Sequence, residues 1–237
     1  MTALTEAGLL AVWEAGLGKG PVRRALALAT AGGADPASVA DLSVGRREEF
    51  VLALRETCFG TVLPCAVDCP ECAGELELEL TVDDVRAGEP EQGTTVSADG
   101  FEVEFRPVTS RDLLAVPARA PDARRRLLGR CVVTATAHGE TKTGDELPDT
   151  VLDALSGALA ACDPQADLAL ELDCASCGHE WRAPFDITAY LWGEMDTYAR
   201  RLLYDVHVLA SGYGWSEREV LAVSPARRRF YLEQVTP

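Results

Sequence analysis

The sequence predicts an α+β fold in which helical N- and C-terminal parts surround a β region. Three observations favour this class. Apolar residues near both ends recur at steps of three and four, as on the buried face of a helix. Two segments, 75–80 and 168–172, place apolar residues at every second position, as half-buried strands do. Each segment adjoins a Cys-x-x-Cys pair, and the 101 residues between the pairs (73–173) leave room for a mixed α/β insertion.

The N-terminal helical part covers residues 1–60 and should contain three helices. Each begins at a residue type that favours a helix start and ends near glycine. The predicted starts are Thr5, Pro21 and Ser43, and the corresponding ends lie within 16–20, near 32–33 and at Gly60.

The β region is predicted to comprise residues 61–85 and 166–187. In both stretches one strand leads into a Cys-x-x-Cys pair and a second strand leads away from it. The pairs are Cys69 with Cys72 and Cys174 with Cys177, so the two stretches form a weak internal repeat. They look like the two halves of a zinc ribbon, separated by the insertion.

The mixed insertion is predicted at residues 86–165. A connection rich in Gly, Pro and Glu comes first, at 86–99, and Asp99-Gly100 marks a hairpin turn. The remaining expected elements are a short helix capped by Ser110, a helical run leading into Cys131, a polar loop at 138–146 and a helix beginning at Pro148.

The C-terminal helical part, residues 188–237, should open with one long helix. The apolar residues of this helix, from Leu191 to Leu209, form a single stripe. The features expected after it are a break at Gly212 and Gly214, a capping box of Ser216 and Glu219, and a last helix opened by Ser224-Pro225.

The composition is that of a globular protein with a strong acidic bias. Of the 237 residues, 47% are apolar and 25% are charged, and the 22 basic and 38 acidic residues give a net charge of -16. A field of that sign repels phosphate backbones, so the charge disfavours general nucleic-acid binding.

No targeting or membrane-spanning segment is expected. The N-terminus lacks a charged segment followed by an apolar run, and no stretch approaches the roughly 20 apolar residues that cross a bilayer. We therefore expect a cytoplasmic protein without direct membrane insertion. Because cytoplasmic thiols stay reduced, clustered cysteines there favour metal binding over disulfides.

The two cysteine pairs have the pattern of a structural zinc site. A Cys-x-x-Cys knuckle places two thiolates about 3.5–4 Å apart, which Zn–S bonds of roughly 2.3 Å can bridge. Two knuckles complete a tetrahedron, so Cys69, Cys72, Cys174 and Cys177 are the predicted Zn²⁺ ligands. Such a site contributes folding energy and has no open position to activate water. Four buried cysteines, two disulfides or a redox pair are the alternatives.

Other candidate residues show no catalytic pattern. Gly74 and Gly178 suit the tight backbone that follows each cysteine pair. His179 is interpreted as an exposed or supporting residue, and His138 and His207 as structural residues. The cysteines predicted to fill core space are Cys58, Cys65, Cys131 and Cys162. No nucleophile–base pair and no phosphate-binding glycine loop occurs, so we expect no enzyme and no small-molecule substrate.

Two basic clusters, Arg124–Arg126 and Arg227–Arg229, interrupt the acidity. Zinc ribbons often bind nucleic acid, so a nucleic-acid-binding regulator is the alternative function. Neither cluster adjoins a knuckle in the sequence, and neither is interleaved with exposed aromatic residues on a strand. We interpret both as solvated helix faces or as edges that contact protein.

The order of several short motifs resembles a known family. The motifs are Gly45-Arg46-Arg47, Leu54-Arg55-Glu56, Phe59-Gly60, Phe105-Arg106-Pro107, Asp112-Leu113-Leu114, Leu127 to Cys131, Trp181, Ala183 to Ile187, Tyr198 to Leu203, His207, Tyr213 to Glu217 and Ser224 to Arg228. This order is similar to that of phage baseplate-type proteins encoded beside contractile, phage-tail-like injection systems. The closing helix pair is also similar to small phage tail-assembly proteins.

The resemblance implies a non-enzymatic structural or assembly component of a baseplate. The implied partners are protein subunits of a baseplate or tail tube, and the motifs identify no binding residue beyond the four cysteines. We expect zinc to fix how the two helical parts face each other, so that their surfaces can contact those subunits.

Overall fold

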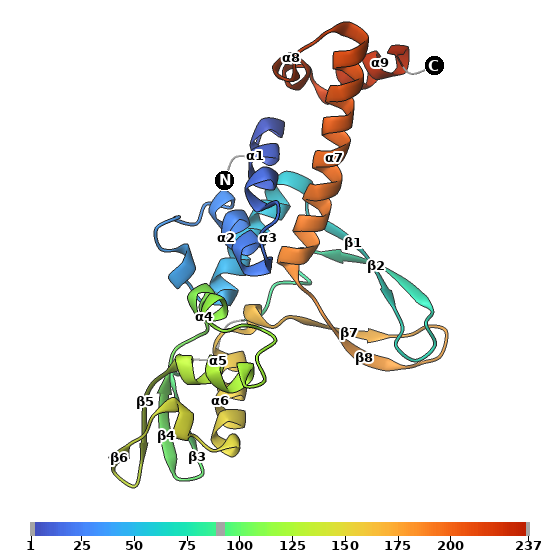
Figure 1. Cartoon of the computed structure of the whole chain (residues 1–237). Helices are drawn as coiled ribbons and strands as arrows, with labels where there is room; N and C mark the ends of the chain where they lie inside the picture. The colour runs from blue at the N-terminus through green and yellow to red at the C-terminus, as the bar shows by residue number, and fades with distance from the viewer. Residues whose placement is uncertain (1–2, 89–92, 236–237) are drawn as a thin grey trace.

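The computed structural model describes residues 3–88 and 93–235 and confirms the α+β class. Part of the predicted connection at 86–99 lies outside the described residues. Four regions are visible in Figure 1: a central helical body, two projecting β-hairpins, the insertion, and a long helix that carries a C-terminal helical head.

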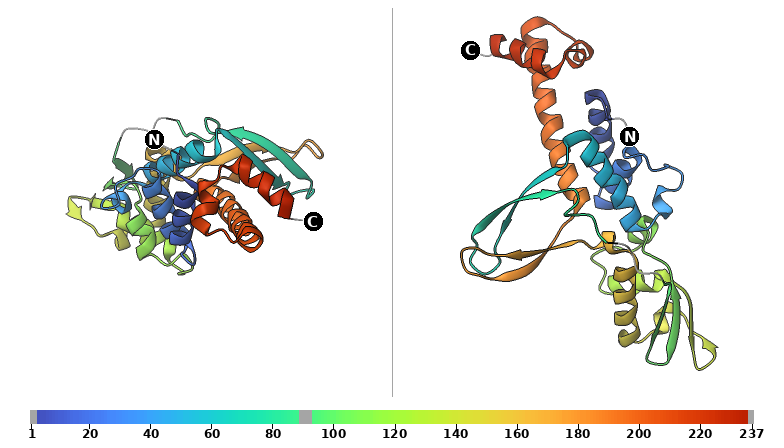
Figure 2. Two further views of the ribbon diagram at one scale, coloured as in Figure 1. Left: turned by 90° about the horizontal axis from the view of Figure 1, so that it is seen from above. Right: turned by 180° about the vertical axis from the view of Figure 1, so that it is seen from behind.

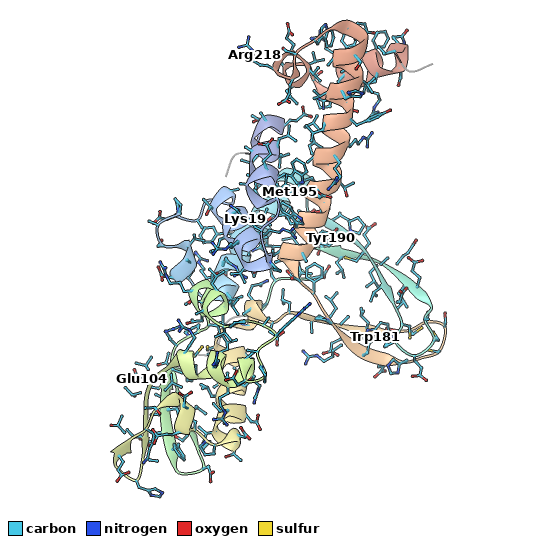
Figure 3. The ribbon with its side chains drawn as sticks, viewed as in Figure 1. Lys19, Glu104, Trp181, Tyr190, Met195 and Arg218 are labelled. Atoms are coloured by element: carbon cyan, nitrogen blue, oxygen red, sulfur yellow. The ribbon has the colours of Figure 1, made fainter. Side chains whose placement is uncertain are left out.

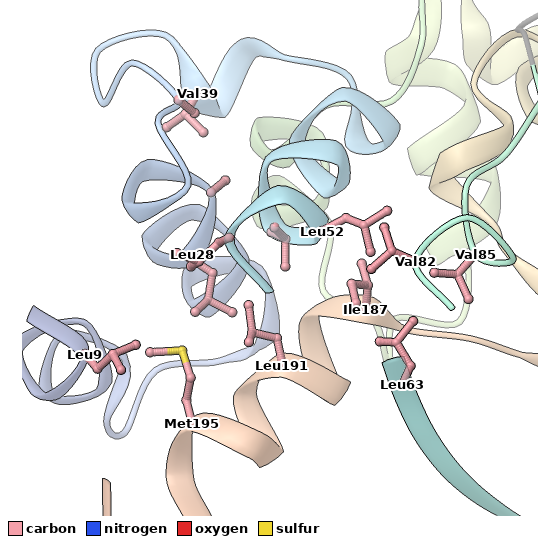
Figure 4. Close-up of a cluster of buried hydrophobic side chains, with 14 residues drawn as sticks. Leu9, Leu28, Val39, Leu52, Leu63, Val82, Val85, Ile187, Leu191 and Met195 are labelled. Carbon is pink, nitrogen blue, oxygen red and sulfur yellow. The ribbon is translucent and has the colours of Figure 1, made fainter. Parts of the chain in front are cut away.

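The helical body joins the two ends of the chain through one hydrophobic core. Helices α1 (Glu6–Gly16), α2 (Pro21–Ala31) and α3 (Val44–Phe59) pack around the first turns of α7 (Ile187–Tyr213). Figure 4 shows Leu9, Leu28 and Leu52 of the N-terminal helices gathered near Leu191 and Met195 of α7. The two helical parts therefore contact each other directly, and a contribution of the cysteine site to their mutual placement stays a prediction.

Two hairpins project from this body. Strands β1 (Val62–Asp68) and β2 (Glu75–Thr81) form one antiparallel sheet, and β7 (Ala169–Asp173) and β8 (Glu180–Pro184) form another. We call residues 62–81 and 169–184 together the arm. Near the body, the arm residues Leu63, Cys65, Leu80 and Leu170 join the central core. Farther out, the hairpins extend away from the helices in every view (Figures 1 and 2).

The insertion has its own apolar core. Strands β3 (Thr95–Ala98), β4 (Phe101–Phe105), β5 (Val132–Ala137) and β6 (Glu140–Thr141) form a four-stranded sheet in that order. Helices α5 (Ala123–Cys131) and α6 (Asp149–Cys162) accompany this sheet, and Phe105 and Leu155 are among the residues buried between them. The proposed boundaries of the insertion, 86 and 165, stay a prediction.

A buried ion pair attaches the C-terminal head, which follows α7, to the helical body. Helices α8 (Glu217–Ala222) and α9 (Pro225–Val235) lie at the far end of α7. Arg228 of α9 donates a 2.7 Å hydrogen bond from Nη1 to Glu6 of α1, and the Tyr198 hydroxyl donates to the same carboxylate at 2.9 Å. This contact joins the first and last helices of the described chain.

Most predicted helix starts and turns are confirmed. The hydroxyl groups of Thr5, Ser43 and Ser216 each accept a backbone N–H at a helix start. Three details differ: Thr109, not Ser110, caps α4 (Ser110–Ala115), the polar loop at 138–146 contains β6, and Gly212 lies inside α7. Gly214 does end α7, with a left-handed φ of 72°.

A close backbone approach ties α3 to the end of the insertion. The Gly45 N–H donates to Asp163 Oδ2 at 2.9 Å, and the Ser43 hydroxyl donates to Oδ1 at 3.2 Å. A Cβ on Gly45 would lie 2.1 Å from Asp163 Oδ1, so no side chain fits without displacing this carboxylate.

Gly45→Ala should therefore destabilise the protein by about 1–3 kcal/mol, as overpacking does elsewhere. Equilibrium urea unfolding measures the change. Gly157→Ala on α6 is the matched control, because its Cβ meets nothing within 4 Å and should be neutral or stabilising. Equal stability of the Gly45→Ala and wild-type proteins would contradict the account.

Candidate metal centre

The four predicted ligands meet at the tip of the arm. Cys69 and Cys72 lie in the turn between β1 and β2, and Cys174 and Cys177 lie in the turn between β7 and β8. The backbones of the two turns match. In each turn the N–H of the first cysteine donates to the carbonyl five residues later, and the carbonyl of that cysteine accepts from the N–H four residues later. The repeat in the sequence therefore corresponds to two turns with the same backbone hydrogen bonds.

Each knuckle needs one residue in the left-handed region. In the second knuckle this residue is Gly178, with φ 72°, as the sequence suggested. In the first knuckle it is Ala73, with φ 55°, rather than Gly74. Gly74 instead leaves room for a ligand atom, because a Cβ at this position would lie 3.3 Å from Cys72 Sγ.

Ala73→Gly should stabilise the arm by about 1 kcal/mol, because glycine adopts the left-handed region without the penalty of a Cβ. Gly178→Ala should have the opposite effect of similar size. Hydrogen exchange of the hairpin amides in the metal-loaded protein measures both changes. A loss of protection in Ala73→Gly would refute the assignment of strain to this residue.

The spacing of the sulfur atoms fits a single metal ion. Cys69 Sγ lies 3.7 Å from Cys177 Sγ, Cys72 Sγ lies 3.6 Å from Cys174 Sγ, and all four sulfurs lie within 4.8 Å of one another. A tetrahedral Zn–S length of roughly 2.3 Å corresponds to S···S separations of about 3.8 Å. The cysteines are free thiols, since a disulfide would require about 2.05 Å.

The surroundings of the knuckle cysteines shift the pKa values of Cys174 and Cys177 in opposite directions. Backbone N–H groups of Cys177 and Ser176 lower the pKa of the Cys174 thiol to about 6. At Cys177 the backbone N–H of His179 acts in the same direction, but burial and the neighbouring sulfurs raise its pKa to about 12. A bound cation would be needed to keep all four sulfurs deprotonated at this spacing. Four protein ligands also leave no open coordination position.

The remaining cysteines and histidines are not among the grouped ligand atoms of this cluster. As predicted, Cys58 and Cys65 pack against the central core, and Cys131 and Cys162 belong to the core of the insertion. His179 stacks on Trp181 of β8, with ring centroids 5.9 Å apart. Figure 3 labels Trp181 on the arm. His138 forms the β5–β6 turn with a φ of 53°, and His207 is exposed on α7.

All three arginines of the first basic cluster, and Arg228 of the second, form ion pairs within the chain. In the first cluster, Arg124 pairs with Asp153, Arg125 with Asp149 and Arg126 with Asp122. In the second cluster, Arg228 is buried against Glu6 and Asp205. Among residues 3–88 and 93–235, no helix is long and apolar enough to cross a membrane.

The sequence reasoning missed a set of buried charged residues that hold the regions together. Arg55, buried within α3, donates two hydrogen bonds to Glu194 of α7 at 2.8 and 3.0 Å. Arg47 contacts Glu48 and donates to Ser110 at 2.8 Å. Asp112 accepts from Arg106 and Arg130. Five of these residues, Arg47, Arg55, Arg106, Asp112 and Arg130, lie in the motifs of the family resemblance, which was the available signal.

The comparison with known families gives one match. The model of the T4 bacteriophage base plate protein family matches residues 30–190, which is more than half of the chain. The matched stretch begins near the end of α2 and contains the insertion and both cysteine knuckles. No curated protein and no solved structure matches. The chain belongs to the T4 bacteriophage base plate protein family.

Proposed function

We propose that this protein is a non-enzymatic structural or assembly component of the baseplate of a phage-tail-like contractile injection particle. The observation that carries the proposal is the family match across residues 30–190. Its partners would be protein subunits of the baseplate or tail tube, which it would meet after synthesis in the cytoplasm.

The metal in this proposal is a single structural Zn²⁺, with Cys69, Cys72, Cys174 and Cys177 as its ligands. When bound, it would supply four metal–sulfur bonds and no catalysis. The knuckle backbones hold the four sulfurs in position, and two of the cysteines, Cys69 and Cys174, are buried. The hairpins form separate two-stranded sheets, and isolated hairpins of this kind are marginally stable. The ligands would therefore fix the arm as one unit.

The alternative function, nucleic-acid binding through a zinc ribbon, has less support. The arginines of the first basic cluster are paired with aspartates, and Arg228 of the second is buried. The arm itself carries eight acidic residues and one arginine. A negative surface at the metal centre disfavours contact with phosphates.

Expression of the gene together with its neighbouring genes tests the proposal. A tagged chain should co-purify with baseplate or tube subunits, and elemental analysis of the purified chain should find one zinc per chain. A filter-binding assay at moderate salt should detect no specific DNA or RNA complex. Nucleic-acid binding without co-purification of particle subunits would refute the proposed function.

A further inference from the structure

An apolar groove runs along the surface of the first two helices. It has a volume of about 560 Å³ and lies between α1, α2 and the 3₁₀ helix η1 (Val39–Asp41). Its walls include the half-buried side chains of Val12 and Leu26, together with several alanines. In the described part of the chain the groove stays open to solvent. We call it the α1–α2 groove.

The two helices that form this groove are apolar on both of their sides. On the inner side, Leu9, Leu28 and Ala29 are buried in the central core. The outer side has no matching polar stripe, because Glu6 and Glu14 are the only charged residues of α1 and neither lines the groove. A helix that is apolar all round is normally covered all round. The composition of the hairpin is therefore that of a helix pair with a further element packed on its outer side.

The charge at the groove is opposite to that of the chain. Lys19 and Arg23 line the groove, and no acidic residue of the described ranges does, although the net charge of the chain is -16. Both cations are exposed, and neither forms an ion pair with a residue of 3–88 or 93–235. Arg24, on the same helix, is by contrast held over the ring of Trp192 of α7, 4.6 Å from its centroid. Two uncompensated positive charges thus lie beside the apolar walls.

The shape and the charge together fit an amphipathic helix with carboxylates beside its apolar stripe. Helices bind such grooves through apolar residues that recur at steps of three and four. The groove is lined by Ala11 and Ala15 of α1 and by Ala27 and Ala31 of α2, and each pair has the four-residue spacing of one helix face. These small side chains let a third helix approach closely.

Other occupants match fewer of these features. A basic helix would be repelled by Lys19 and Arg23. A phosphate backbone would pair with both cations but would leave the apolar walls uncovered, and the flat surface of a bilayer cannot fill a concave groove. Two copies of a chain with a net charge of -16 repel each other.

We infer that the α1–α2 groove binds an acidic amphipathic helix of another protein subunit. The inference rests on the proposed function, because that subunit would be a component of the same particle. The apolar stripe of the helix covers the alanines, Val12 and Leu26, and its carboxylates pair with Lys19 and Arg23. Most of the groove precedes residue 30, where the family match begins, so this contact uses helices outside the matched stretch.

Photocrosslinking of the tagged full-length chain, expressed with its neighbouring genes, tests the contact directly. A benzophenone amino acid at Ala15, which is exposed in the groove, should crosslink to an acidic helix of a co-purified particle subunit. Mass spectrometry identifies the joined peptide. The matched control places the same amino acid at Ala160, an exposed alanine of α6 that does not line the groove, and should give no crosslink to that helix.

Two substitutions separate the apolar contribution from the charged one. Ala15→Glu places a carboxylate against the apolar stripe of the partner and should lower capture of the subunit at least about tenfold, whereas Ala160→Glu should capture it like the wild type. Lys19→Glu with Arg23→Glu should also lower capture about tenfold and should remove the weakening of capture by salt.

The control for the charge reversal changes the same net charge elsewhere. Arg119 and Arg218 are exposed and have no ion pair within the described ranges, so Arg119→Glu with Arg218→Glu should leave capture unchanged. Every variant should keep the melting temperature of the wild type to within a few degrees, because the replaced side chains are exposed. Replacing acidic residues of the crosslinked helix by lysine should restore capture by the Lys19→Glu, Arg23→Glu chain.

The outcomes distinguish this inference from the proposed function. If the wild-type chain co-purifies with particle subunits, full capture by folded Ala15→Glu overturns the inference alone. A crosslink from Ala15 to a second copy of the chain or to a segment without acidic residues, or the absence of any crosslink, does the same. Failure of the wild-type chain to co-purify overturns both.

Discussion

Replacing Cys174 by serine should abolish metal binding and release the arm while the helical body stays folded. Removing one of four thiolates weakens a site whose binding free energy, in zinc-finger peptides, is about 10–16 kcal/mol. Metal content should fall from one ion per chain to nearly none, and hairpin amides beyond Cys65 should lose protection from hydrogen exchange. The core around Leu191 should keep its protection, because α1, α2 and α3 pack on α7 without the cysteines.

Cys65→Ser is the control for this experiment. Cys65 lies in the same hairpin, is half-buried, and its Sγ lies 3.5 Å from the Leu63 carbonyl rather than in the sulfur cluster. This variant should keep its metal. A Cys174→Ser chain with full metal content and a protected arm would show that Cys174 is not a ligand. Particle assembly should fail in Cys174→Ser and succeed in Cys65→Ser.

The second large effect is expected at Asp112, which lies at the junction between the helical body and the insertion. Its carboxylate accepts from Arg106 at 2.6 and 3.0 Å, from Arg130 at 3.0 Å, and from the hydroxyl and N–H of Thr109 at 2.7 and 3.0 Å. Asp112→Ala removes two ion pairs together with the Asp112 half of the capping box that it forms with Thr109. The Asp112 side chain is 1% exposed, whereas Arg106 and Arg130 are 41% and 44% exposed and can regain water.

Asp112→Ala should therefore destabilise the protein by about 3 kcal/mol, near the lower end of the range for broken buried pairs. The melting temperature should fall by about 6–12 °C. Asp149→Asn is the control, since Asp149 pairs with Arg125 but is 84% exposed, and it should cost about 1 kcal/mol or less. Equal effects of the two substitutions would contradict the central role of Asp112.

The same carboxylate makes stability depend on pH. Burial alone would raise the pKa of Asp112, but hydrogen bonds from Arg106 and Thr109 hold it well below its ordinary value. A folded-state pKa below the unfolded value gives stability that is complete above about pH 4 and is lost as the pH falls further. Urea midpoints measured from pH 6 to pH 3 should fall less steeply for Asp112→Ala than for the wild type.

Local signals in the sequence were sufficient for most of the fold. Thr5, Ser43 and Ser216 act on backbone groups within a few residues, so their capping roles could be read from the sequence alone. The same holds for the knuckles, because each Cys-x-x-Cys pair sets its own turn. Their pairing into one site was predictable from the repeat, since four thiols in two matching turns suit one tetrahedral ion.

Features that depend on distant partners were not predictable. Arg55 and Glu194 are 139 residues apart, and nothing near either residue indicates the other. The ion pair of Asp112 with Arg130 joins α4 to α5, and no local pattern around Asp112 indicates it. Similarly, the alternation in β2 identifies a strand but not its partner, so the sequence could not show that the two hairpins form separate sheets.

The position of the two knuckles also constrains the order of events during synthesis. At a translation rate of about 5–20 residues per second, Cys174 is synthesised roughly 5–20 s after Cys72. During this interval Cys69 and Cys72 lack the other two cysteines of the site. The insertion is made during this interval and has its own core, in which α6 packs against β3 and β4. An insertion that folds first shortens the flexible loop between the two knuckles. The entropic cost of bringing the knuckles together is then smaller. Binding of a metal ion by all four cysteines would then be a late step in folding.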